Sequence, residues 1–253
     1  MLLAVILLTA TKAWPATIAV LKDKRKVGLL ALCSGLIFIN WQVYVIGIAS
    51  GHIVESSLGY FINPLVTIVL AVFFQKERLS PWQWIAVGLG ALAVTVLTVD
   101  YGHLPVIALS LAISFGFYGL VKSRIGGSIS PLIGYSVETG FLVPVAVVQG
   151  IVVASTGGLA IGTQGTWSWL GLLLFGFFTA IPLIMFGSAA KLLPLSYVGL
   201  LQYMTPVIQF ITALAVFHEP MPPARWIGFG LVWVGLAALT YDMLSRSRRP
   251  IKG

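Results

Sequence analysis

The sequence predicts an all-α membrane protein with nine visible transmembrane helices of an expected ten, arranged as two inverted five-helix repeats. Three observations support this fold class. The 253-residue chain is 58% hydrophobic and 9% charged, whereas a soluble domain is about 25% charged. Its apolar runs approach the roughly 20 residues that a helix needs to cross a bilayer. Finally, one half of the chain can be aligned with the other. A soluble globular domain is excluded, because its surface must be covered by polar groups.

Nine stretches are long and apolar enough to be membrane helices, or nearly so. In order, they are roughly residues 1–20, 27–49, 54–75, 82–99, 104–121, 131–153, 167–190, 195–217 and 225–244. The first is the weakest, because Lys12 and Pro15 interrupt it. The runs are continuous, whereas strands of a membrane barrel alternate in polarity.

The positions of lysine and arginine predict the topology. Of the 15 basic residues, only Arg225 falls in the loops of one side, and the rest fall in the alternate loops. The positive-inside rule places the richer side in the cytoplasm, together with the C-terminus and the basic tail of residues 245–253. The net charge of +8 therefore reflects membrane topology, and no nucleic-acid partner is expected.

A shift of 142 residues superimposes two parts of the chain without a gap. It pairs Pro64 with Pro206, Glu77 with Glu219, Trp84 with Trp226 and Gly88 with Gly230. Residues 1–100 are predicted to be the first repeat and residues 104–244 the second. Five segments per repeat would place the two copies in opposite orientations. The same shift places Met1 opposite Val143, inside a helix, so we expect one helix and part of another to precede Met1 in a complete version.

The stretch ESSLGYFINPLVTIVLAVFFQKERLSPWQWIAV at residues 55–87 and the stretch LLQYMTPVIQFITALAVFHEP resemble the RarD-type branch of the EamA family, in the drug/metabolite transporter superfamily. The resemblance runs from about Lys24 to Asp242. It implies ten helices, transport of a small molecule across the bacterial inner membrane, and a link to chloramphenicol sensitivity. We expect this chain to depart from that pattern by lacking the first helix and part of the second. A non-transporting or decayed paralogue that acts as a partner or regulatory protein is the alternative function.

Polar residues inside the apolar runs are the candidates for a substrate site. A proline inside a helix frees the carbonyl four residues earlier, and in lipid that carbonyl must find a partner. Pro64 and Pro206 would therefore be matched kinks, one in each repeat. The candidate cavity-lining residues are Asn40, Trp41, Tyr60, Asn63, Gln202 and Tyr203, with Gln209 as a weaker candidate. Helix-packing hydrogen bonds are the competing interpretation of these residues.

Glu138 is the clearest buried carboxylate, about two turns into the segment 131–153. A carboxylate at the centre of a membrane helix costs about 2.5–3.5 kcal/mol on insertion scales, so it must face a cavity or a partner. One interpretation is a proton-coupling residue, and the other is a protonated glutamate bonded to a neighbouring helix. Glu77 and Glu219 end their helices and are predicted to form a salt bridge or cap. Glu55, at a helix start, suits the helix dipole.

Enzyme motifs are missing from the sequence, which contains no HExxH, GxSxG or P-loop pattern. The chain is therefore predicted not to be an enzyme and to need no cofactor or metal. The expected partners are a small-molecule substrate and the lipid bilayer, with proton coupling and a homodimer as further expectations.

Overall fold

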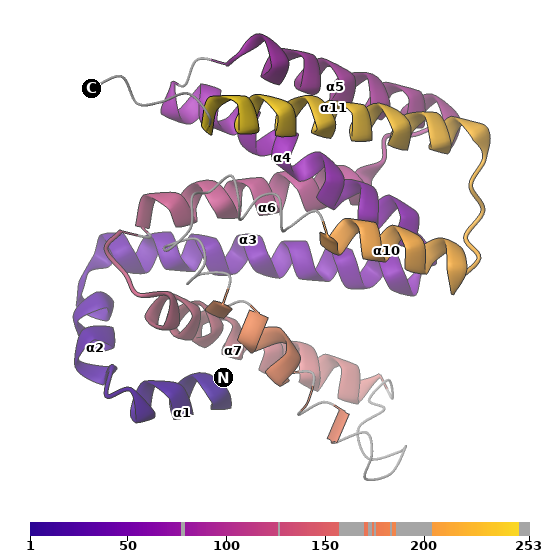
Figure 1. The fold of residues 1–253 in the computed structure, drawn as a ribbon. Coiled ribbons are helices and arrows are strands. Elements are labelled where there is room, and N and C mark those ends of the chain that lie inside the picture. The colour runs from indigo at the N-terminus through magenta and orange to yellow at the C-terminus, as the bar shows by residue number, and fades with distance from the viewer. Residues whose placement is uncertain are drawn as a thin grey trace, which may run out of the picture. The chain divides into compact units, whose positions relative to one another are not determined.

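The computed structural model describes residues 1–76, 79–125, 127–156 and 204–247, and short helical stretches between residues 170 and 185. Within this part of the chain every regular element is a helix (Figure 1). Six helices are long and apolar enough to cross a membrane, or up to seven spans if a bent pair near the N-terminus counts as one. The all-α membrane prediction is confirmed at this level. The number nine stays a prediction, because residues 157–169 and 186–203 lie outside the described part.

The six long helices agree with the predicted segments within a few residues. They are α3 (Lys24–Ala49), α4 (Ile53–Gln75), α5 (Pro81–Tyr101), α6 (Val106–Ile125), α7 (Pro131–Ser155) and α11 (Pro223–Ser247). The chain divides into two compact units. Unit 1 comprises Met1–Phe38 with Val121–Pro194, and unit 2 comprises Ile39–Leu120 with Leu195–Gly253. Each unit draws on both predicted repeats, so the repeat boundaries at residues 100 and 104 stay a prediction.

The N-terminal segment is not the single helix that was predicted over residues 1–20. It forms α1 (Leu2–Ala10) and α2 (Trp14–Lys22), which are bent by 114° at the break. Lys12 adopts a left-handed backbone with φ of 52°. Pro15 occupies the first turn of α2, where its missing N–H costs nothing, although it could not continue a preceding helix. Both short helices pack against α7 within unit 1.

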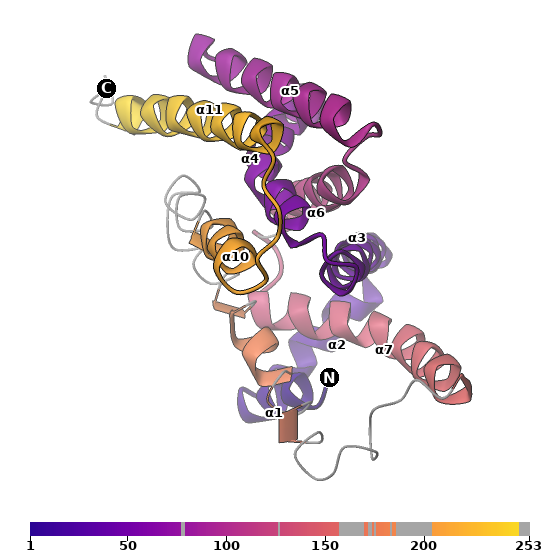
Figure 2. The ribbon, with the colours of Figure 1, turned by 90° about the vertical axis from the view of Figure 1, so that its right-hand side faces the viewer.

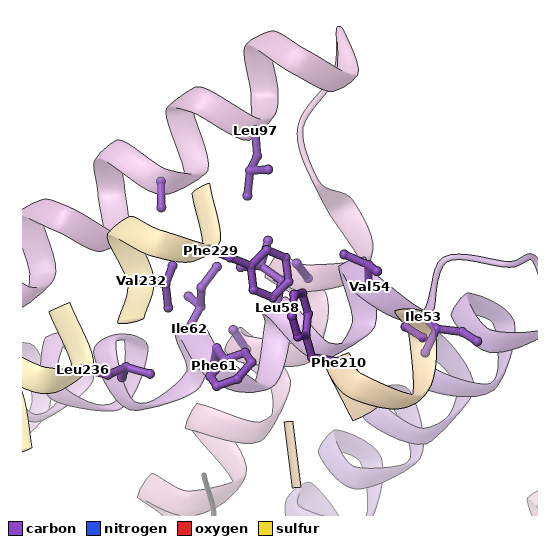
Figure 3. Packing of buried hydrophobic residues seen from close by; sticks show 14 residues of the cluster. Ile53, Val54, Leu58, Phe61, Ile62, Leu97, Phe210, Phe229, Val232 and Leu236 are labelled. Carbon is purple, nitrogen blue, oxygen red and sulfur yellow. The ribbon is translucent and has the colours of Figure 1, made fainter. Parts of the chain in front are cut away.

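Helices α4, α5, α10 (Met204–Ala215) and α11, most of α6 and the second part of α3 belong to unit 2, which has an apolar core (Figure 3). Phe61 of α4, Phe210 of α10 and Phe229 of α11 meet there, with the rings of Phe210 and Phe229 4.6 Å apart. Ser80 and Gln83 form a capping box at the start of α5, which satisfies backbone groups that a helix end leaves open.

Helices α5 and α11 lie side by side in both views (Figures 1 and 2). Leu97, near the end of α5, lies against Gly228, near the start of α11. At the opposite ends, Ala86 of α5 and Leu239 of α11 share a buried cluster. The two helices are therefore antiparallel. The shift of 142 residues relates Ala86 to Gly228 and Leu97 to Leu239, so equivalent positions make both contacts.

Helices α4 and α6 approach each other closely at Gly59. A Cβ atom on this glycine would lie 2.7 Å from the carbonyl oxygen of Ala108 and 2.9 Å from the Cβ of Leu111. Because one of these atoms belongs to the backbone, no rotamer change can make room. The close approach brings the polar side chains of α4 and α6 within hydrogen-bonding range of α3.

Candidate functional site

A hydrogen-bonded group of uncharged side chains lies inside unit 2. The amide nitrogen of Asn40, on α3, donates to the carbonyl oxygen of Leu111 and to the hydroxyl of Ser114, both on α6, at 3.0 Å each. The hydroxyl of Tyr60, on α4, donates to Oδ1 of Asn40 at 3.1 Å. Asn40 is 1% exposed, so it lies in the interior with its hydrogen bonds made by three helices. The structure thus brings together two of the residues predicted from sequence.

A further hydrogen bond involves α10. Nε2 of Gln209 donates to the hydroxyl of Tyr44 at 3.0 Å. The ring of Tyr44 meets the ring of Tyr60 edge-on at 5.9 Å, and Phe115 meets Tyr60 at 6.2 Å. Aromatic pairs at these distances attract each other through their quadrupoles. Gln209 was the weaker candidate from sequence, whereas Tyr44 and Ser114 were not singled out.

Asn63 lies one turn after Tyr60 on α4 and is 8% exposed. Its Oδ1 is buried and finds no hydrogen-bond partner in the part of the chain that the structure describes. This oxygen faces α6, 3.6 Å from where a Cβ on Gly116 would stand. Oε1 of Gln209 is likewise buried without a partner among the described residues. We call Asn40, Tyr44, Tyr60, Asn63, Ser114 and Gln209 the uncharged polar cluster.

The remaining predicted site residues lie outside the uncharged polar cluster or outside the described part of the chain. Trp41 is 40% exposed and lies outside the uncharged polar cluster. Pro64 is inside α4, as predicted, and Pro206 lies near the first described residue of α10. The other two predicted residues, Gln202 and Tyr203, lie outside the described residues. The matched pair of kinks therefore stays a prediction.

Glu138 lies in unit 1, where Nζ of Lys122 contacts its Oε1 at 2.6 Å. The glutamate side chain is 7% exposed and the lysine side chain 29%. From α3, Ser34 donates a hydrogen bond to the backbone carbonyl of Glu138 at 3.1 Å. Cys33, also buried, lies close enough to Glu138 and Lys122 for their charges to act on its thiol. The sequence predicted that Glu138 needs a partner but assigned Lys122 to a loop. In the structure Lys122 belongs to the last turn of α6.

Two acidic residues of unit 2, Glu55 and Glu219, accept hydrogen bonds from the first turns of helices. Oε2 of Glu219 accepts a hydrogen bond from the backbone N–H of Val54 at 2.9 Å, and Oε1 lies 3.9 Å from Arg225. Oε1 of Glu55 accepts from the N–H groups of Ile107 and Ala108 at the start of α6. The predicted salt bridge or cap of Glu219 is confirmed. Its counterpart Glu77 lies outside the described residues.

Arg225 also contacts two residues at the end of α5. Its guanidinium lies 3.8 Å from Asp100 and 4.8 Å from the ring centroid of Tyr101, both at the end of α5.

Across the described ranges, no three His, Cys, Asp or Glu side chains gather as metal ligands would.

Comparison with known proteins gives consistent matches. Residues 1–99 match the model of the EamA-like transporter family. Protein RarD of Streptomyces exfoliatus is 44% identical over 242 residues, covering 96% of this chain and 76% of that protein. The uncharacterized transporter YojE of Bacillus subtilis is 40% identical over 227 residues, covering 89% and 75% respectively. One solved structure superimposes with a TM-score of 0.56 at 18% identity, covering 95% of this chain and 84% of the other, which shows the fold alone.

Proposed function

Because this chain belongs to the EamA-like transporter family, in its RarD-type branch, we propose that it is a secondary transporter that carries a small metabolite or drug across the bacterial inner membrane. Membership makes the chain a multi-pass membrane transporter rather than an enzyme. The substrate, the coupling ion and the orientation are the proposed parts.

The observation that carries the proposal is the uncharged polar cluster inside an apolar helical unit. Asn40 and Asn63 are 1% and 8% exposed, in helices that qualify as membrane spans. Burying a polar group without full compensation costs about 1–3 kcal/mol in proteins. Two amide oxygens without partners in the described chain therefore represent a stability cost. A substrate that hydrogen-bonds to them would offset that cost, which supports a binding role.

The proposed transporter alternates access between two inverted repeats, with the C-terminus in the cytoplasm. The antiparallel packing of α5 against α11 supports this arrangement, because equivalent helices of inverted repeats run in opposite directions. Labelling of single cysteines tests it. On a Cys33→Ala background, Leu79→Cys should react from the cytoplasm and His218→Cys from the outside. Labelling of both positions from the same side refutes the inverted arrangement.

Proton coupling is proposed to use Glu138 with Lys122 as its counter-charge. The charged or titratable groups beside Glu138 include Lys122 and Cys33. A carboxylate can accept a proton when its partner ammonium withdraws, so the pair combines a proton site with a helix contact. The distance of 2.6 Å between Nζ of Lys122 and Oε1 of Glu138 corresponds to the paired state.

Purified protein in liposomes with an internal pH dye provides the functional test. A panel of metabolites and amphenicols is added outside, and substrate-dependent proton movement is recorded. We expect Glu138→Gln to abolish proton movement. Thr98→Val, which removes a hydroxyl bonded only within α5, should leave proton movement intact. Normal proton movement in Glu138→Gln removes this residue from the mechanism.

A further inference from the structure

We infer that the uncharged polar cluster recognises a neutral, flat molecule that carries at least two N–H or O–H donors, and that it discriminates against both anions and cations. This inference rests on the proposed transport function, because it names the substrate class of the same site. The side chains of α3, α4, α6 and α10 that form the cluster define the chemistry of this ligand.

The cluster contains no charged side chain, and this composition favours a neutral ligand. Its side chains are two asparagines, one glutamine, one serine and two tyrosines, all neutral at pH 7. An ion buried among them would lose hydration, and none of these six residues would provide a counter-charge. Because uncompensated charge inside a membrane protein is costly, a neutral occupant is favoured over an ion of the same shape.

The two unpaired oxygens carry the second step. Oδ1 of Asn63 and Oε1 of Gln209 are buried and have no hydrogen-bond partner in the described chain. Most buried polar atoms in proteins have a partner, so an orphan acceptor in a polar group indicates where a donor is missing. By contrast, Asn40 uses both its amide nitrogen and its oxygen within the cluster. Asn40 therefore organises the cluster, whereas Asn63 and Gln209 each keep a buried oxygen that a donor of a ligand would satisfy.

The aromatic rings carry the third step. Tyr44 and Phe115 each contact the ring of Tyr60 edge-on. Rings at such a site offer flat apolar surface to a planar group while the amide oxygens bind its donors. A planar amide, a urea or a donor-bearing aromatic ring combines these properties.

Four ligands with a common benzene ring test this class with the full chain in lipid nanodiscs. Benzamide is neutral with two N–H donors, and N,N-dimethylbenzamide is neutral with none. Benzoate and benzamidine are the matched anion and cation. Binding of tritiated benzamide is measured directly, and the other three compete with it. We expect benzoate and benzamidine to bind at least about tenfold more weakly, and N,N-dimethylbenzamide about 2- to 10-fold more weakly.

Two variants of Asn63 separate recognition from folding. Asn63→Leu should reduce the preference for benzamide over N,N-dimethylbenzamide and raise the melting temperature of the ligand-free protein, because a buried unpaired oxygen is lost. Asn63→Asp should shift the preference toward benzamidine. Thr98→Val should retain the wild-type order of binding.

The inference is overturned if none of the four ligands binds, if either ion binds as well as benzamide, or if Asn63→Leu leaves the preference unchanged. Transport is tested separately by proton movement in liposomes. Loss of all proton movement with the binding order intact would reject the transport mechanism and keep the ligand class. Proton movement with an altered binding order would do the reverse.

Discussion

Replacing Lys122 with methionine removes the ammonium that lies 2.6 Å from Glu138, while it keeps a long unbranched side chain. The carboxylate, 7% exposed, must then remain charged without the Lys122 ammonium or take up a proton. An ordinary glutamate in water has a pKa of about 4.3, so its protonation costs about 3.7 kcal/mol at pH 7 and about 1 kcal/mol at pH 5. Breaking a buried ion pair from one side typically costs about 3–5 kcal/mol. Because the lysine is partly exposed, we expect Lys122→Met to lower the free energy of unfolding by about 2–4 kcal/mol at pH 7.

The pH dependence distinguishes this mechanism from a loss of packing. The penalty should fall to about 1 kcal/mol at pH 5, because the proton that neutralises Glu138 is then cheaper to bind. Unfolding is followed by tryptophan fluorescence in mixed micelles of dodecyl maltoside and sodium dodecyl sulfate. The double variant Lys122→Met/Glu138→Gln removes both charges and should regain most of the stability. If the double variant loses the sum of the two single effects, or if the penalty is the same at both pH values, the reasoning is refuted.

Three further perturbations follow from the packing. Gly59→Ala should lower the free energy of unfolding by about 1–3 kcal/mol, because the new Cβ would meet the backbone of α6. The control Gly35→Ala places its Cβ in open space and should not destabilise the protein. Melting temperatures of the two variants in detergent test this difference. Arg225→Gln should cost about 1–2 kcal/mol through its contacts with Asp100, Glu219 and Tyr101, and a melting temperature equal to that of the native chain would contradict this. The backbone N–H of Lys26, followed by that of Arg25, lowers the pKa of Asp23 below its usual value of 3.8, so the Asp23 cap of α3 is fully present above pH 3.8 and is lost as the pH falls through the lowered pKa. Hydrogen exchange at the backbone N–H groups of Arg25 and Lys26 should therefore be faster in Asp23→Ala than in the native chain at pH 7. A difference in exchange that persists once the native carboxyl is protonated would be inconsistent with this cap.

Much of the fold follows from composition, because apolar run length and helix length are set by the same bilayer thickness. The predicted bounds of 131–153 differ from those of α7, Pro131–Ser155, by two residues. The prediction failed at residues 1–20, where summed hydropathy conceals a break. Lys12 and Pro15 were visible as interruptions, but a window average does not register a left-handed residue between two helices or a proline in the first turn of the second.

The candidate site was harder to predict, because pairing partners leave no periodic signal. The cost of burying Glu138 predicted that it needs a partner, yet the sequence could not identify Lys122. A lysine near a helix end can turn outward to the interface or inward, and its long apolar stem permits both. Tyr44 and Ser114 also look like ordinary members of apolar runs. Their roles depend on Gln209 and Asn40, which are 165 and 74 residues away along the chain.

The hydrogen bond between Glu219 and the start of α4 affects how the protein is made. The N–H of Val54 leaves the ribosome 165 residues before the carboxylate that caps it, and the same separation divides Tyr44 from Gln209. At about 5–20 residues per second, synthesis takes roughly 10–30 s to deliver the missing groups. During that interval the N–H of Val54 lacks the carboxylate that accepts its hydrogen bond in the folded chain. The start of α4 therefore reaches its final hydrogen bonding only after α10 and the segment that carries Glu219 have been made.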